Sequence, residues 1–397
     1  MAEPAASSVG PRTPVVISPA AQDALSRLWS VRIPGWLDPY APQWADAFAD
    51  GTWTARWGTF PALAPLAAAA LGFFFAVFWP WIDYVYSESL VFMGLLIAGA
   101  LLSGPLGAMM FFGYIVGDFL GDAFQGYYTR APLGMAGGRL VSYILLGLLA
   151  VRVPALARRM AERAPLPVEP TLRLAVRLFL YAAGSALLVF LWCQAMIVLI
   201  RPVFTWVRQS PTTEAIMHVQ TQWKWLVAMA VVASLARLVL ETTTSGSGAG
   251  ADLVASLQQE RWSHVQRRGE FTRRLMGPGR LILATLVVTL LLSGTYEGWI
   301  DPVIVAGIVV FLGAWRYGVI GRLPTGWVSF VRKIPALVRL AVAALVGYVF
   351  AYVILWGLWR LGSLRAVAAG SLLTLAMFYL LFPGRRQSAL AGGRQRE

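Results

Sequence analysis

Two aspartates lie one helical turn apart in an apolar, glycine-rich stretch of the sequence. Asp118 and Asp122 share one face of a helix, and Gly113, Gly117 and Gly121 form a neighbouring ridge at the same spacing. Small residues at every fourth position allow a second helix to approach closely. Carboxylates at membrane depth are costly unless they are paired or hydrated, and they mark ion and proton pathways. The pattern therefore predicts a cation or proton site near the outer face of a membrane.

The same residues also have a structural interpretation. In it, Asp118 and Asp122 end a transmembrane helix and sit in water, while the glycines serve only helix packing. The two interpretations differ in whether Asp118 belongs to a polar interior or to the outer surface.

A predicted helix break precedes this stretch at Ser103, Gly104 and Pro105. Proline removes an amide donor and glycine favours a turn. Backbone groups that a break exposes at membrane depth must line a cavity or be buried in protein. Charge favours two helices over one long span between residues 88 and 121. The loop 82–88 has no basic residue and four arginines mark the inner end of the helix after residue 139, so an even number of crossings must separate residues 82 and 139.

Other reactive residue types do not form a recognisable site in the sequence. The only histidines, His218 and His264, fall on opposite predicted sides of the membrane. The single cysteine, Cys193, lies inside an apolar block, which excludes a disulfide framework and a cysteine-based metal cluster. Motifs of zinc proteases, serine hydrolases and ATPases are absent from the sequence. We therefore expect no enzymatic activity, metal or cofactor.

The helices that position these residues can be predicted from the amino-acid composition and from the apolar blocks of the sequence. The chain has 397 residues, of which 58% are hydrophobic and 13% are charged, against about 25% charged residues in soluble proteins. The apolar residues form blocks that match the thickness of a bilayer. We predict an all-α, polytopic transmembrane helical bundle of about ten spans, with a range of eight to ten. The ten predicted ranges are 59–81, 88–103, 105–121, 140–157, 174–200, 223–241, 279–294, 301–320, 336–358 and 365–382.

The distribution of positive charge predicts the orientation of the chain. With both termini in the cytoplasm, 26 of the 33 basic residues fall on the inner side and 7 on the outer side, which agrees with the positive-inside rule. The net charge of +14 lies on the inner face. It indicates attraction to anionic inner-leaflet lipids, not to nucleic acid. The preference for arginine over lysine is typical of a GC-rich bacterium, so we expect a bacterial plasma membrane protein.

The spans and charges divide the chain into five predicted parts. These are a cytoplasmic tail with interfacial amphipathic segments (1–57), a first membrane bundle of about six spans (58–241), a cytoplasmic loop with a basic amphipathic helix (242–278), a second membrane bundle of about four spans (279–383) and a basic cytoplasmic tail (384–397). The first tail carries several tryptophans typical of the headgroup region. Its alternative role is a soluble element that binds a partner.

The loop 242–278 contains the predicted basic amphipathic helix. Its helical part places leucines on one flank and arginines on the other, which predicts a helix lying on the inner leaflet. The arginines expected to contact the lipid surface are Arg261, Arg267, Arg268, Arg273 and Arg274. An acidic cytoplasmic protein partner is the alternative.

These features favour a secondary transporter or permease for a small solute or ion, with Asp118 and Asp122 at its site. The alternative function is a non-transporting membrane anchor or assembly subunit that acts through its cytoplasmic tail and loop. A transporter should bury Asp118 or another acid in a polar cavity, whereas an anchor should have a tightly packed apolar bundle.

Overall fold

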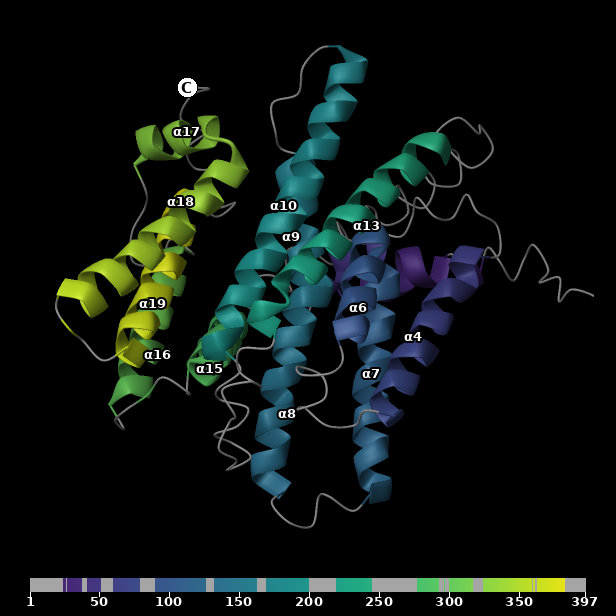
Figure 1. Cartoon of the computed structure of the whole chain (residues 1–397), viewed down its shortest axis with the longest axis horizontal. Helices are drawn as coiled ribbons and strands as arrows, with labels where there is room; N and C mark the ends of the chain where they lie inside the picture. Colours follow the sequence, from purple (N-terminus) through teal and green to yellow (C-terminus); the bar gives the residue numbers. More distant parts are fainter. Residues whose placement is uncertain are drawn as a thin grey trace, which may run out of the picture.

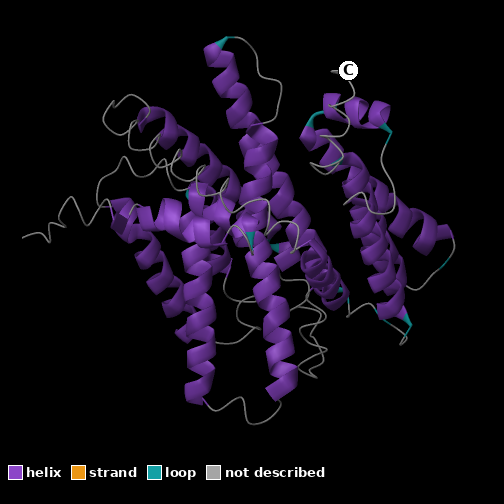
Figure 2. Cartoon of the chain, turned by 180° about the vertical axis from the view of Figure 1, so that it is seen from behind, coloured by secondary structure: helices purple, strands orange, loops and turns teal. Residues whose placement is uncertain are grey.

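The chain folds into helices throughout the part that the structure describes (Figures 1 and 2). The structure is a computed structural model that describes residues 24–25, 27–37, 41–50, 60–78, 90–125, 132–162, 169–199, 219–244, 277–292, 296, 300–316, 324–358, 360 and 363–382. Within these ranges there is no β-strand. The predicted all-α class is therefore confirmed.

The helices form two groups along the sequence. The first group contains η1 (Leu28–Arg32), α2 (Ile33–Leu37), α3 (Pro42–Ala49), α4 (Phe60–Phe78), α6 (Leu90–Leu102), α7 (Gly104–Gln125), α8 (Pro132–Gly147), η4 (Leu148–Arg152), α9 (Val153–Glu162), α10 (Pro170–Leu199) and α13 (Trp223–Thr244). The second contains α15 (Gly277–Leu291), α16 (Asp301–Arg316), α17 (Thr325–Lys333), α18 (Ala336–Tyr348), η6 (Val349–Leu358) and α19 (Ser363–Leu381). In Figure 1, the second group is drawn in green and yellow.

Five helices are long and apolar enough to cross a membrane. They comprise Gly104–Gly121, Gly138–Ala161, Leu172–Met196, Trp223–Thr242 and Ala336–Leu358. Five shorter apolar helices comprise Leu63–Phe78, Leu90–Leu102, Leu281–Leu291, Asp301–Trp315 and Ala368–Leu381. Each of the ten predicted ranges overlaps one of these helices. The number of crossings and the side on which each terminus lies stay predictions.

Two of the irregular helical turns have a local cause in the sequence. The wide π-helical turns of η1 and η4 end two residues before Pro34 and Pro154, respectively. Proline cannot donate the amide hydrogen bond that a regular helix needs, so the preceding turn adjusts. As a result, α8, η4 and α9 continue as one long helix from residue 132 to residue 162.

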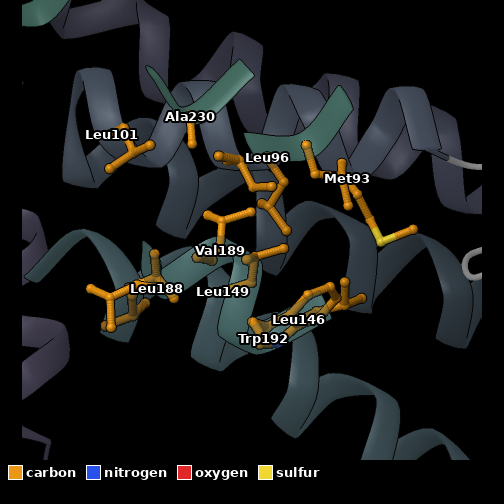
Figure 3. Packing of buried hydrophobic residues seen from close by; sticks show 14 of the residues in the cluster. Met93, Leu96, Leu101, Leu146, Leu149, Leu188, Val189, Trp192 and Ala230 are labelled. Atoms are coloured by element: carbon orange, nitrogen blue, oxygen red, sulfur yellow. The ribbon is translucent and has the colours of Figure 1, made fainter. Parts of the chain in front are cut away.

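The centre of the first group is apolar and closely packed (Figure 3). The side chains labelled in Figure 3 come from α6, from the α8–η4 helix, from α10 and from α13. They include Met93, Leu96, Leu101, Leu146, Leu149, Leu188, Val189, Trp192 and Ala230. The indole of Trp192 donates a hydrogen bond of 3.2 Å to the carbonyl oxygen of Leu145. Its one polar atom therefore has a partner inside the bundle.

Glycines bring α4 and α7 into backbone contact. A Cβ atom at Gly113 would overlap the carbonyl oxygen of Ala69, and one at Gly117 would lie 2.6 Å from the carbonyl oxygen of Phe73. The two pairs rise together in residue number, so the helices run in the same direction. This is the close approach that the glycine spacing predicts.

We expect Gly113→Ala to lower the free energy of unfolding by about 1–3 kcal/mol, because overpacked helices must shift apart. The measurement is the midpoint of thermal unfolding of the purified protein in detergent. Gly307→Ala in α16 is the matched control, since a Cβ atom there meets nothing within 4 Å. An equal fall in both midpoints would contradict the packing argument.

Candidate functional site

The chain changes direction between two helices at the predicted break. Helix α6 ends at Leu102 and α7 begins at Gly104. The amide of Ser103 still donates to the carbonyl oxygen of Gly99 at 2.9 Å, and the Ser103 carbonyl accepts the amide of Leu106 at 3.0 Å. Ser103 itself is buried. The last carbonyl groups of α6 and the first amide of α7 therefore need partners from elsewhere.

A carboxylate from the N-terminal segment binds the first amide of α7. The Oδ2 atom of Asp50, which directly follows α3, accepts a hydrogen bond of 3.2 Å from the amide of Gly104. Helix α3 lies against this point so closely that a Cβ atom at Gly104 would overlap the backbone of Ala47. Glycine is required here because only its missing side chain allows α3 to reach the start of α7.

Two arginines from distant helices bind the same carboxylate. The guanidinium group of Arg237 in α13 donates to both oxygens of Asp50, at 2.6 and 2.7 Å. Such a bidentate arrangement is strong and directional. Arg158 in α9 forms a second ion pair with Asp50 Oδ1. The side chains of Asp50 and Arg237 are 8% and 9% exposed, so these charges are nearly removed from solvent.

A backbone carbonyl group at the end of α6 accepts hydrogen bonds from the same group of residues. The carbonyl oxygen of Leu101 accepts hydrogen bonds from the hydroxyl of Tyr181 in α10, at 2.9 Å, and from Arg237, at 3.3 Å. The guanidinium group also lies 5.7 Å from the centre of the Tyr181 ring, which adds a cation–π contact. The break is thus buried in protein. We call this set the break cluster; it comprises Asp50, Leu101, Gly104, Arg158, Tyr181 and Arg237.

Two more acids extend the break cluster toward its surface. Asp46, on the same N-terminal segment as Asp50, pairs with Arg159 at 2.7 Å, and both side chains are 41% exposed. Glu241 lies 3.7 Å from Nε of Arg237, one helical turn further along α13. Helix α3 is therefore attached by one buried ion-pair network and one exposed ion pair.

A second charged group lies further along α7. Asp118 is 2% exposed and accepts a hydrogen bond from the hydroxyl of Tyr143. Arg139, which is 5% exposed, places its Nε atom 3.6 Å from the same carboxylate oxygen. Both partners come from α8. We call these three residues the Asp118 cluster.

The Asp118 cluster bears on both interpretations of the aspartate pair. Asp118 lies in the interior and is bound to protein groups, not at a water-exposed helix end. Its use as a cation or proton site stays a prediction. The side chain of Asp122 lies outside the described residues. Arg139 directly precedes the predicted span 140–157, but it is buried inside a helix that is long enough to cross a membrane.

The two clusters are separated along one pair of helices. Gly104 and Asp118 are 14 residues apart in α7, which corresponds to about 21 Å of helix. The α8–α9 helix reaches the same two places with Tyr143 and Arg158. Charged contacts therefore link α7 to the α8–α9 helix at two levels, directly at Asp118 and through Asp50 of the N-terminal segment at Gly104. Apolar packing lies between these levels.

Most residues of the break cluster could not be identified as partners from the sequence. Arg237 falls inside a predicted span, and a charged residue at such a position is a signal of function or of buried pairing. Asp50 carries no comparable signal, because nothing in the tail indicates that residue 50 contacts residue 237. The proposed lipid-contacting arginines of the 242–278 loop lie outside the described residues; they are Arg261, Arg267, Arg268, Arg273 and Arg274.

We expect Asp50→Asn to lower the free energy of unfolding by about 3–5 kcal/mol, because it removes the carboxylate that binds the buried Arg237 and the largely buried Arg158. The measurement is chemical or thermal unfolding of the purified chain in detergent. Asp46→Asn is the matched control on the same segment. Its exposed ion pair should contribute about 0–1 kcal/mol. Equal losses in the two variants would show that the break cluster has no special role in stability.

No protein-family model, no curated protein and no solved structure matches this chain. Its function therefore has to be inferred from its own residues and their arrangement.

Proposed function

We propose that this protein is a secondary transporter or permease for a small solute or ion in a bacterial plasma membrane. The observation that supports the proposal is the Asp118 cluster, an ionisable group buried in a helix long enough to cross the membrane. Ionisable residues at such depth are costly, and they usually belong to substrate, ion or proton pathways.

In the proposed mechanism, Asp118 alternates between two partners. With Arg139 and Tyr143 bound, its charge is compensated and α7 is held against α8. A proton or a small cation on the carboxylate weakens both contacts, because it removes or competes for the negative charge. The ligand thereby favours a state in which α7 and α8 separate at this level. The break cluster, at the other level of the same helices, stays closed.

This arrangement suits alternating access. A transporter must open on one side of its site while it stays closed on the other. Two charged clusters about 21 Å apart along α7 provide two such closures from one pair of helices.

The second candidate function is a membrane anchor or assembly subunit that does not transport. The apolar centre of the first helix group favours it, because residues such as Leu96, Leu146 and Leu149 are fully buried there (Figure 3). In that case both clusters serve only to hold the helices together. The two functions differ in whether Asp118 has a role beyond stability.

The first test concerns orientation. We expect a cysteine at position 87 (Ser87→Cys) to react with a membrane-impermeant maleimide in intact cells, and a cysteine at 388 (Ser388→Cys) to react only after permeabilisation. The positive-inside distribution requires this result. The native Cys193 is buried and should give no background. Labelling of position 388 in intact cells would reject cytoplasmic termini.

The second test concerns transport. Proteoliposomes on a solid-supported membrane are exposed to concentration jumps of protons, sodium, potassium, amino acids, sugars and carboxylates. We expect a transient current for at least one solute. Asp118→Asn should lower it by about tenfold or more, the factor that corresponds to about 1.4 kcal/mol.

Matched controls separate function from folding. Glu169→Gln removes one exposed negative charge at the start of α10 and should leave the current unchanged. Unfolding midpoints show whether Asp118→Asn is folded. A full current in a folded Asp118→Asn variant would remove Asp118 from the mechanism. Absence of current for every solute in the wild type would favour the anchor.

A further inference from the structure

The break cluster is built like an anion-binding site that already holds an anion. Donors from three helices converge on the two oxygens of one carboxylate: the amide of Gly104, both terminal nitrogens of Arg237, and Arg158. The amide is the first of α7, where the helix dipole and the unpaired backbone donors favour negative charge.

The donors belong to the bundle, whereas the acceptor belongs to the N-terminal segment. Arg237 is held from its own side by the Leu101 carbonyl at 3.3 Å, by the Tyr181 ring at 5.7 Å and by Glu241 at 3.7 Å. None of these three contacts comes from α3. The guanidinium group, in a residue that is 7% exposed, is therefore oriented by the bundle itself.

Asp50 reaches this site as the end of a short attached helix. Apart from the carboxylate, α3 is attached by the Asp46–Arg159 pair, which is exposed, and by apolar side chains such as Phe48. The chemistry that binds the carboxylate of Asp50 would bind any carboxylate or phosphate group of similar size, because a bidentate arginine and backbone amides recognise both.

We propose that the break cluster is a binding site for a carboxylate or phosphate group, and that Asp50 is its tethered occupant. A small anion takes the place of the Asp50 side chain when that side chain is absent. This proposal does not depend on whether the protein transports a solute.

The test is chemical rescue of the full chain, purified in a maltoside detergent without added lipid. We expect sodium acetate or phosphate to raise the unfolding midpoint of Asp50→Ala by about 2–4 °C above sodium chloride at matched ionic strength, since a ligand stabilises the state that binds it. The wild type should show no such difference, because its site is filled. A separate arm adds phosphatidylglycerol, so that a lipid headgroup is distinguished from a free anion.

The controls identify the site. Asp46→Ala should behave like the wild type, and Asp50→Ala/Arg237→Gln should lose the rescue. If Asp50→Ala does not fold, Asp50→Ser replaces it, since the small hydroxyl can still accept a hydrogen bond and leaves room for the anion. Rescue by lipid alone assigns the site to a headgroup. The proposal is overturned if neither small anions nor lipid exceed chloride, or if rescue persists without Arg237.

Discussion

The structure depends on one constraint, which is that backbone groups at a helix break in a membrane protein must find partners within the protein. At Ser103 and Gly104 those partners are supplied by the Asp50 carboxylate, the Arg237 guanidinium and the Tyr181 hydroxyl. Satisfying the break therefore brings together α3, α7, α9, α10 and α13. The N-terminal segment is part of the bundle for this reason, and Gly104 must lack a side chain so that the segment can approach.

The charged clusters and the apolar core have complementary roles. Apolar packing at the centre of the first helix group has no direction, and many arrangements of leucines would have similar free energies. Buried ion pairs are different, because a wrong register leaves charges without partners at a high cost. Asp50 and Asp118 thus select one arrangement of α7 against the α8–α9 helix. For the same reason, we propose these carboxylates as the points at which a proton, a cation or a competing anion changes the balance between arrangements.

Both helix groups expose large apolar side chains, such as Phe179 on α10 in the first group. Large apolar side chains are exposed along α18 and η6, including Leu345, Tyr348 and Leu358. Such surfaces suit contact with lipid, because acyl chains and apolar side chains are chemically alike. The ion-pair clusters around Asp50 and Asp118 belong to the first group, so the proposed activity is assigned there.

The sequence by itself determined the helices and the position of the break. Hydropathy, proline and glycine act over one or two helical turns, so the ten apolar ranges and the glycine-mediated packing of α7 could be read directly from the residues. The partners of the charged residues were decided only by the tertiary structure. Asp50 and Arg237 are 187 positions apart, and Asp118 meets Arg139 only because α7 and α8 pack side by side. No local pattern encodes these pairs, since the free energy of a buried charge depends on which helices surround it.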